Sequence, residues 1–456
     1  MELPTAPALP PSLELEIIKR LPADARARAA CVCPRWRDAL KDPSLWLRLD
    51  LSVTSGVTCS VNYEALKAAA ARAGGALQAL DLTGRTCLLH PVREVVAANA
   101  ASLRELRTLC SSLLTVPADE LVEPPSFGDE SYMTILRQMM TALPALQVVE
   151  ADAWGGCAAA RRVLRNEPPF GPLRLRKLSI YLDANTDIPA LTPDLVAHPS
   201  LTKLELVSDL SRDARLPGAA LSSLLDTAST LRLSGLFCFG CCPTQADAPA
   251  LASLISRSTF TSLEFAAQGD DAPRMDAMLD GPAAALLANA VRASRTLQEL
   301  TLHNVRLWDD VEAALVLLDA LTGHVSLRKL DCSFNSVDPT AAAIIDAALG
   351  ALVEANAPAF EELHVTGCGL RVTNLGPMVD ALLRNTHLHT LAMEGNGMSD
   401  DFAAQRLLPA VRANTSLRML TVDLEYGREE PDPAAEAMRF VNDREAARTR
   451  RTWTLW

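Results

Sequence analysis

The amino-acid sequence predicts an α/β fold in which a small all-helical domain is followed by a curved array of strand–helix repeats. Three observations lead to this prediction. A Leu-x-x-Leu-x-Leu frame recurs along most of the chain, an amphipathic helical stretch precedes each of its clearest copies, and the first fifty residues instead suggest short helices separated by prolines. Because one strand–helix pair cannot bury its own apolar side, neighbouring repeats must stack, with a parallel sheet inside and helices outside.

The N-terminal stretch, residues 9–46, predicts three short helices. Pro10 suits a helix start, and Pro22 ends that helix. Asp24 can cap a second helix, while Pro34 fits the first turn of a third. The apolar side chains form two stripes, more than three such helices can bury among themselves. Part of this surface must therefore face a partner or the following domain.

This stretch resembles an F-box. The family pattern begins with Leu-Pro, continues through spaced apolar residues and ends with Val-Cys-x-Arg-Trp and Leu-Trp. The chain departs from this pattern at two places. Residues 25–29 alternate alanine and arginine where the family usually has a leucine-rich helix start, and Pro34 stands where the family usually has Lys or Arg. The resemblance implies docking on a Skp-family adaptor, and through it on a cullin. The residues expected to make this contact are Leu9, Pro10, Leu13, Ile17, Leu21, Val32, Trp36, Leu45 and Trp46.

The repeat frame is clearest between residues 290 and 425, where successive copies begin 28 to 33 residues apart. These copies begin at Leu297, Leu327, Phe360, Leu388 and Leu417. Weaker and less evenly spaced copies begin at Leu77, Leu103, Leu146, Leu175, Leu201, Ala228 and Phe260. Amphipathic helices are expected at 341–355, 375–385 and 401–414.

The frame and its helices resemble leucine-rich repeats of the ribonuclease-inhibitor-like type. In that family an Asn or Cys hydrogen-bonds the turn after the strand, and Asn335, Cys368 and Asn396 fall at this position. We therefore expect an F-box over residues 1–50 (core 9–46), a leucine-rich-repeat solenoid over 51–425 and a C-terminal cap over 426–456. The apolar residues expected to close the last repeat are Trp453, Leu455 and Trp456.

The non-leucine strand positions should face the concave side of the sheet, where a protein substrate could bind. Most polar residues there need no other explanation than contact with solvent. Carboxylates outnumber bases among them, which favours a partner with a basic segment. The residues that we expect at this surface are Tyr181, Glu205, Arg232, Glu264, His303, Asp331, His364, Glu394 and Asp423.

Charge and composition narrow the possible functions. The net charge of −12 disfavours nonspecific binding of nucleic acid. The odd number of cysteines, 11, favours reduced thiols inside a cell. We find no long apolar run and no signal-peptide pattern, so we expect a cytoplasmic or nuclear protein that does not enter a membrane. Two acidic, Pro- and Gly-containing stretches, 116–131 and 268–281, are expected to be surface loops.

We find no sequence signal for catalysis. The chain contains no P-loop, no Gly-x-Ser-x-Gly and no dinucleotide fingerprint. Cys238-x-x-Cys241-Cys242 is the one metal-like spacing, and the further ligands that zinc needs do not follow it. We therefore expect no cofactor, no metal and no catalytic residues.

These observations favour a non-catalytic substrate-recognition subunit of an SCF-type ubiquitin ligase, with the F-box on the adaptor and the repeats on the substrate. The alternative is a leucine-rich-repeat scaffold or inhibitor that uses its F-box-like helices as a cap or an anchor. That the protein is an enzyme is the third hypothesis, and it has the least support in the sequence.

Overall fold

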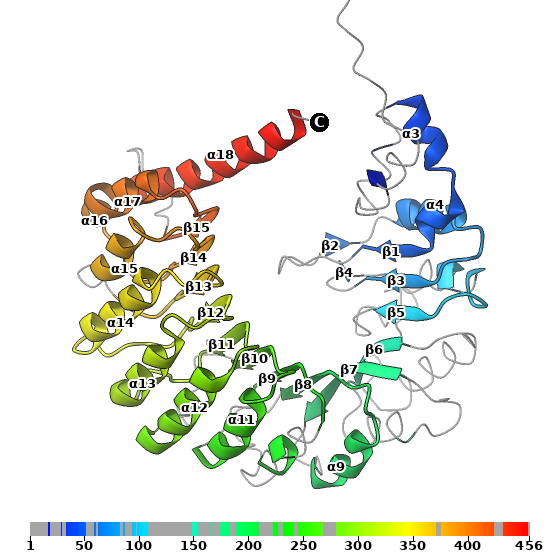
Figure 1. Ribbon diagram of the computed structural model, residues 1–456. Coiled ribbons are helices and arrows are strands. Elements are labelled where there is room, and N and C mark those ends of the chain that lie inside the picture. Colours follow the sequence, from blue (N-terminus) through cyan, green and yellow to red (C-terminus); the bar gives the residue numbers. More distant parts are fainter. Residues whose placement is uncertain are drawn as a thin grey trace, which may run out of the picture. The chain divides into compact units, whose positions relative to one another are not determined.

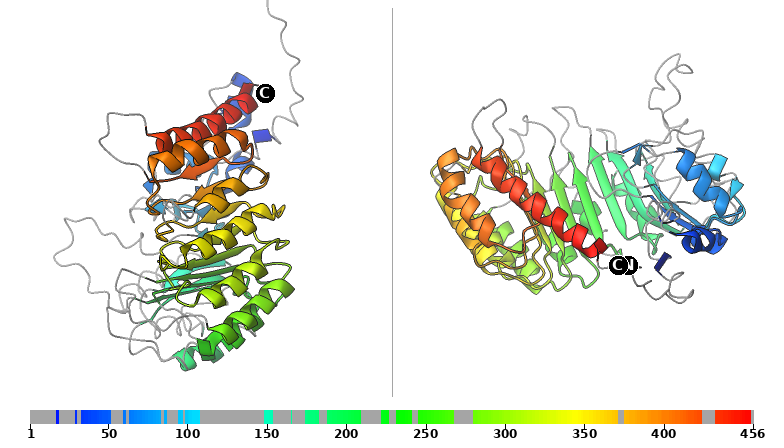
Figure 2. Two further views of the ribbon diagram at one scale, coloured as in Figure 1. Left: turned by 90° about the vertical axis from the view of Figure 1, so that its left-hand side faces the viewer. Right: turned by 90° about the horizontal axis from the view of Figure 1, so that it is seen from above.

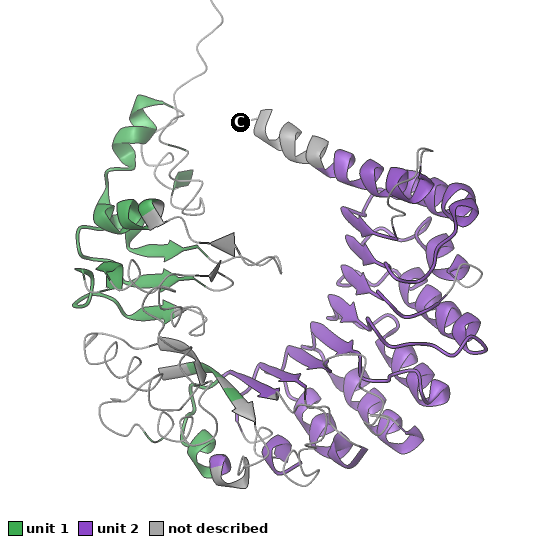
Figure 3. Ribbon diagram, turned by 180° about the vertical axis from the view of Figure 1, so that it is seen from behind, with its two compact units in different colours: residues 1–181, 193–201 green, residues 182–192, 202–456 purple. Residues whose placement is uncertain are grey.

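The computed structural model describes much of the chain and divides it into two units. Unit 1 comprises residues 1–181 and 193–201, and unit 2 comprises residues 182–192 and 202–456 (Figure 3). The described residues are 17–18, 29, 33–51, 59–60, 63–82, 85–86, 94–96, 98–107, 148–153, 165, 174–182, 188–208, 222–226, 231–240, 245–267, 280–370, 375–423 and 432–454. Both units contain parallel strands with connecting helices, so the predicted α/β fold class is confirmed.

Unit 1 begins with short helical elements. Helix α3 spans Pro34–Ala39, with proline in its first turn as predicted, and the Cys33 Sγ accepts the N–H of Trp36 at its start. The 3₁₀ helix η1 spans Pro43–Trp46. Of the two helices predicted before α3, the described residues are 17, 18 and 29, and all three are helical.

The strands of unit 1 pair in parallel in the order β1-β3-β5-β6-β7 (Figure 1). Each of the weak frames that begin at Leu77, Leu103, Leu146 and Leu175 leads into one of these strands, so these early copies are confirmed. The bounds are β1 Arg48–Asp50, β3 Ala79–Asp81, β5 Glu105–Arg107, β6 Val148–Ala153 and β7 Arg174–Leu182, with α4 at Tyr63–Arg72 and a separate parallel pair, β2 Cys59–Ser60 and β4 Arg85–Thr86.

The sheet of unit 1 begins inside the stretch that the sequence assigned to the helical domain. Strand β1 pairs with β3, and Leu49 lies opposite Leu80. The segment 46–51 is itself a copy of the repeat frame, with Trp46 in place of its first leucine. The N-terminal domain therefore supplies the first strand of the array, and β1 precedes the predicted start of the repeats at residue 51.

Unit 2 carries the regular part of the array, with parallel strands in the order β8 to β15 and helices on the outer side (Figures 1 and 2). The strands are β8 Lys203–Ser208, β9 Gly235–Phe239, β10 Ser262–Ala266, β11 Glu299–His303, β12 Lys329–Asp331, β13 Glu362–His364, β14 Thr390–Ala392 and β15 Met419–Thr421. The helical elements are η2 Gln245–Asp247, α11 Ala248–Ile255, α12 Gly281–Ala293, α13 Val311–Leu321, α14 Ala342–Glu354, α15 Gly376–Ala381, α16 Asp400–Phe402, η4 Ala403–Leu407, α17 Leu408–Ala413 and α18 Pro433–Thr454. Helix α9, Ile188–Val196, has residues in both units.

One predicted frame in unit 2 is wrong. The sequence suggested a copy beginning at Ala228, whereas β9 follows a frame that begins at Leu233 and continues through Leu236 and Cys238. These two side chains are buried, and Phe237 and Phe239 alternate with them. The true frame was overlooked because its first residue, Leu233, also fits the last position of the frame that begins at Ala228.

The frame leucines form the core of unit 2. Leu263, Leu300, Leu330 and Leu363 lie opposite one another on adjacent strands and are almost completely buried. Burying one leucine side chain contributes about 1.5–3 kcal/mol. Because every repeat adds such a side chain to a continuous row, the stack stabilises repeats that could not fold singly.

Asn335 links two repeats through its buried side-chain amide. The Oδ1 accepts the N–H groups of Val305 at 2.9 Å and Leu307 at 3.0 Å. The Nδ2 donates to the carbonyls of Leu302 at 2.6 Å and Cys332 at 2.8 Å. The amide thereby satisfies backbone groups that the short strands leave without partners.

Asn396 and Cys368 take the same position in the neighbouring repeats. The Asn396 Nδ2 donates to the carbonyls of Val365 and Met393, at 2.8 and 2.9 Å. The Cys368 Sγ donates to the Cys332 carbonyl at 3.2 Å. The hydrogen bonds that the resemblance implied for these side chains are confirmed.

A second row of buried polar residues, which the sequence did not predict, lies three positions before four of the frames in unit 2. Asn385 accepts the N–H of Leu388 at 2.7 Å and donates to the Val353 carbonyl at the end of α14, 2.7 Å away. Asn414 donates to the Leu382 carbonyl at 2.8 Å. Helix-end carbonyls lack partners within their own helix, so these side chains join each helix end to the next repeat. The row consists of Ser294, His324, Asn385 and Asn414.

His324 fills this position in one neutral tautomer. Its Nδ1 accepts the N–H of Leu327 at 3.1 Å, and its Nε2 lies 3.0 Å from the Val291 carbonyl, so the hydrogen must be on Nε2. Burial lowers the pKa of His324, because the charged ring would lose its hydration. A proton on Nδ1 would also face an N–H donor.

We expect His324 to make the stability of unit 2 sensitive to pH. The unfolded chain takes up a proton near pH 6.5, whereas the folded ring resists it, so the free energy of unfolding should fall as the pH drops below about 6.5, by at most about 1.4 kcal/mol per pH unit. His324→Asn should remove this loss, because Asn385 and Asn414 make equivalent bonds. Urea midpoints at pH 7.5 and 5.5 test this. An equal drop in the variant and the wild type would contradict it.

Helix α18 closes the last repeat with Val441 and Arg444. Val441 is completely buried. The Arg444 guanidinium donates to the carbonyls of Asn414 and Leu417. The predicted capping residues Trp453, Leu455 and Trp456 lie outside the described side chains, so their role stays a prediction.

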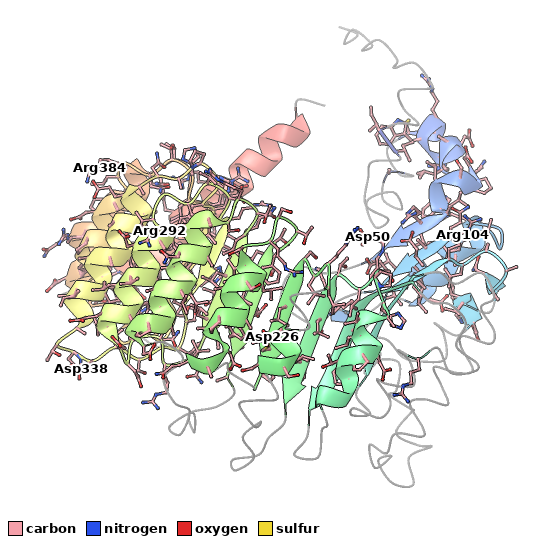
Figure 4. All side chains as sticks on the ribbon, turned by 60° about the horizontal axis from the view of Figure 1, so that its bottom comes forward. Asp50, Arg104, Asp226, Arg292, Asp338 and Arg384 are labelled. Carbon is pink, nitrogen blue, oxygen red and sulfur yellow. The ribbon has the colours of Figure 1, made fainter. Side chains whose placement is uncertain are left out.

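Ion pairs join neighbouring helices on the outer side of unit 2. Arg292 of α12 pairs with Asp319 of α13 at 2.6 Å, and Arg384 pairs with Glu354 of α14 at 2.6 Å. Figure 4 shows both arginine side chains among the helices. Such exposed pairs contribute little to stability. These pairs therefore add little to the stability of unit 2.

Candidate functional site

The first candidate surface is α3 in the N-terminal domain. None of its residues is buried, and it nevertheless carries Trp36, which is only half-buried. Arg35 and Arg37 beside it are exposed. A tryptophan at the surface of a short helix exposes a large apolar area that a protein partner can cover. The geometry therefore leaves Trp36 available for docking.

Leu45 and Trp46, which we expected at the same docking surface, lie elsewhere. Both are almost completely buried, with 3% and 1% of their surface exposed. The Trp46 Nε1–H donates to the Leu40 carbonyl at 2.8 Å, and the Arg72 guanidinium of α4 lies 4.9 Å from the centre of its ring. These two residues join the N-terminal domain to the first repeat, where the chain itself covers almost all of their surface. Contact with an adaptor stays a prediction for them.

The remaining residues predicted for adaptor binding are described only in part. Ile17 is half-buried and helical, and its neighbour Ile18 is completely buried. The other predicted contacts lie outside the described residues: Leu9, Pro10, Leu13, Leu21 and Val32.

The second candidate surface is the concave face of the sheet in unit 2. Four of the predicted residues lie in one register row, in which each position is opposite the next on the neighbouring strand. The row, from β8 to β13, is Glu205, Phe237, Glu264, Thr301, Asp331 and His364. The structure therefore brings Glu205, Glu264, Asp331 and His364 onto one surface. His303 lies in the adjacent row, opposite Ala266.

The other predicted surface residues have different positions. Arg232 is exposed in the turn before β9 rather than on a strand, because the frame there begins five residues later than predicted. Asp423 follows β15, and its carboxylate accepts the N–H groups of Gly395 and Gly397, so it holds a turn of the preceding repeat. Glu394 is exposed after β14. Tyr181 lies in β7, and its side chain is outside the described ones.

Aromatic side chains that the sequence analysis missed lie on the same face. The rings of Phe237 and Phe239 are stacked with centroids 6.2 Å apart. Phe334, in the turn after β12, packs on His303 with a centroid distance of 4.8 Å. The misplaced frame hid the first two residues. Phe334 could have been found from its position seven residues after Leu327, where the neighbouring repeats have Asn or Gly.

The electrostatic environment of Glu264 is predominantly acidic. Partial burial raises the pKa of Glu264, and the neighbouring carboxylates Asp331, Glu299 and Glu205 raise it further. Lys329 acts in the opposite direction. A cation placed over this row would therefore relieve repulsion among the carboxylates.

The described residues offer little for redox or metal chemistry. No group of three or more His, Cys, Asp or Glu side chains among them could hold a metal ion. The Cys238 side chain is buried, and Cys241 and Cys242 lie outside the described residues. Burial raises the pKa of Cys368 to about 12 and that of Cys332 well above its usual range, so both stay protonated.

Among the described helices, none has the length and apolarity that a membrane crossing requires.

Comparison with solved structures finds matches of low identity and low TM-score. The crystal structure of the Rad7 and Elc1 complex in yeast matches with 13% identity and a TM-score of 0.38, over 65% of this chain and 76% of that one. The TLR13–ssRNA13 complex matches with 14% identity and a TM-score of 0.30, over 78% of this chain and 37% of that one. This chain thus spans little more than a third of the length of the second protein. A search of curated proteins found no significant match.

Comparison with family models identifies the N-terminal domain. The family described as F-box-like matches residues 6–52. This range contains α3 with Trp36, the junction residue Trp46 and strand β1. Residues 6–52 of this chain therefore match the F-box-like family, and they lead into an array of parallel α/β repeats.

Proposed function

We propose that this protein is the substrate-recognition subunit of an SCF-type ubiquitin ligase. The F-box-like domain docks on a Skp-family adaptor and, through it, on a cullin. The leucine-rich repeats hold the protein to be ubiquitinated. The observation that carries this proposal is the F-box-like domain at residues 6–52, with Trp36 on a helix that buries none of its residues.

The mechanism is proximity rather than catalysis by this chain. A ligase subunit that holds its substrate beside the charged ubiquitin carrier converts an encounter between separate molecules into one within a single assembly. Such a chain needs a docking surface at one place and a substrate surface at another. The exposed α3 and the concave face of unit 2 fit these two requirements, and the proposed setting is the cytoplasm or nucleus.

Adaptor capture tests the docking step. The full chain is immobilised and titrated with a recombinant Skp-family adaptor, beside a Trp36→Ala variant and a Leu9→Ala, Trp36→Ala double variant. We expect Trp36→Ala to weaken adaptor binding at least about tenfold, since anchoring tryptophans contribute about 2 kcal/mol or more to an interface. Melting curves should change little, because Trp36 is not in the core.

A Val325→Ala variant serves as the control for loss of an exposed apolar side chain. Val325 is 56% exposed, and it belongs to unit 2 rather than to the F-box-like domain. This variant should capture the adaptor like the wild type. The proposal fails if the wild type and the double variant recover equal, background amounts of adaptor.

A scaffold or inhibitor that uses its F-box-like domain as a cap is the second candidate. The observation that favours it is the burial of Leu45 and Trp46 and the pairing of β1 with β3. These contacts give the domain a structural function within the array. A cap of this kind predicts no adaptor capture by the folded wild type, so the same titration separates the two candidates.

A further inference from the structure

The concave face of unit 2 carries an aromatic residue between two carboxylates. Phe237 lies opposite Glu205 on one neighbouring strand and Glu264 on the other. Adjacent strands are about 4.8 Å apart, so the backbone of each glutamate lies one strand spacing from the backbone of Phe237. All three side chains are partly accessible. A flat cation on the ring would have an acidic group on either side.

An apolar strip runs beside this row. Phe239, Ala266 and His303 lie opposite one another on β9, β10 and β11. The side chain of Ala266 ends at its Cβ, so the surface of the strip dips between the rings of Phe239 and His303. Phe334 extends it by packing on His303. Large exposed aromatic groups gathered on one face mark sites of protein contact.

Phe334 occupies a position where a bulky residue is unfavourable. Its φ is 61°, in the left-handed region. The matching positions of four other repeats, seven residues after the start of the frame, are also left-handed and hold Gly240, Asn304, Gly367 and Gly395. Glycine and asparagine tolerate this conformation, whereas phenylalanine is strained in it. Phe334 is nevertheless 49% exposed, so core packing does not explain its presence there.

The geometry points to a bound protein segment in which an arginine stands two residues from a large apolar side chain. The arginine guanidinium stacks on Phe237 between Glu205 and Glu264, and the apolar side chain lies on the strip formed by Phe239, Ala266, His303 and Phe334. We call these residues the aromatic–acidic patch.

The spacing and the charges support this occupant. The two rows are two residues apart along each strand, about 6.6 Å, and side chains i and i+2 of an extended peptide have the same separation. A guanidinium is planar, stacks on aromatic rings and binds carboxylates in pairs, so arginine fits this arrangement better than lysine. The carboxylates around Glu264 outnumber the one lysine near it, which favours a cationic ligand.

This inference deepens the proposed function by naming a substrate class, and it depends on that function only for the role of the segment as a substrate. Binding of the segment needs no adaptor. Peptide binding and adaptor capture can therefore fail separately.

Selection of random peptides displayed on phage, with the full chain as bait, tests the patch. We expect enrichment of peptides with arginine two positions from Phe, Leu, Ile or Trp. A selected peptide should bind at least tenfold more weakly to Phe237→Ala and Glu264→Lys chains. Replacing its arginine by glutamate should abolish binding, and replacing it by lysine should weaken binding.

Two further variants keep the test decisive. Phe334→Asn should also weaken the peptide at least tenfold, while its melting temperature stays equal to that of the wild type or rises, because asparagine accepts the backbone conformation. Glu312→Lys carries the same charge change as Glu264→Lys on the outer helix α13, and it should bind like the wild type. The inference is overturned if no basic peptides are enriched, if acidic ones are, or if binding survives Phe237→Ala and Glu264→Lys.

Discussion

Replacing Trp46 with alanine is expected to destabilise the beginning of unit 1 by about 3–5 kcal/mol, the usual cost of deleting a fully buried tryptophan. The ring is 1% exposed, donates its N–H to the Leu40 carbonyl and lies under the Arg72 guanidinium. It also replaces the first frame leucine of the first strand. The cavity would therefore open between the F-box-like domain and the array.

Hydrogen exchange followed by mass spectrometry measures this effect where it occurs. Amides of 48–50 and 79–81 should exchange faster in Trp46→Ala, while those of unit 2 keep their rates, because repeats stabilise mainly their neighbours. Exchange rates in Trp46→Phe should lie between those of the wild type and Trp46→Ala, since phenylalanine keeps most of the packing. Trp36→Ala is the matched control and should leave these amides protected. Unchanged protection in Trp46→Ala would contradict the assigned junction.

Asn335→Ala is expected to lower the stability of unit 2 by about 2–5 kcal/mol, because buried N–H and C=O groups left without partners cost about 1–3 kcal/mol each and their losses are not additive. The side-chain amide, which is completely buried, serves five backbone groups of two repeats. Alanine serves none of them. The loss should appear as a lower urea midpoint for unit 2.

The chain itself offers a graded control for this prediction. Asn335→Cys copies the residue found at 368, whose thiol donates to one carbonyl, so its effect should be smaller than that of alanine. Ser336→Ala changes the exposed neighbour and should have little effect. If Asn335→Ala and Ser336→Ala unfold at the same urea concentration, the amide does not hold the repeats together.

The frame leucines and the turn residues were predictable because they follow from local sequence. A leucine repeated at a fixed offset buries itself wherever strands stack in parallel, and Asn335, Cys368 and Asn396 make the expected bonds at a fixed distance from it. The row that contains His324, Asn385 and Asn414 has an equally regular position. It was missed because Ser, His and Asn share a function there without sharing a residue type.

Side-chain identity alone misled at two places. Leu233 fits the end of one frame and the start of another, so β9 was displaced and the half-buried pair Phe237 and Phe239 was overlooked. Arg232 was placed on a strand for the same reason. The register of β9 decided the positions of the two phenylalanines and of Arg232, since a strand moved along the sequence presents different residues on its faces.

The sequence by itself determined the α/β repeat class, the F-box-like domain and the core of the later repeats, because these follow from local patterns of apolar residues. Only the tertiary structure decided which apolar side chains of the N-terminal stretch are buried and which remain at the surface. Trp36 and Trp46 are ten positions apart in one motif, yet one remains at the surface and the other is buried. That division depends on whether another element covers the ring, and Arg72 of α4, which lies over Trp46, comes from well beyond the motif.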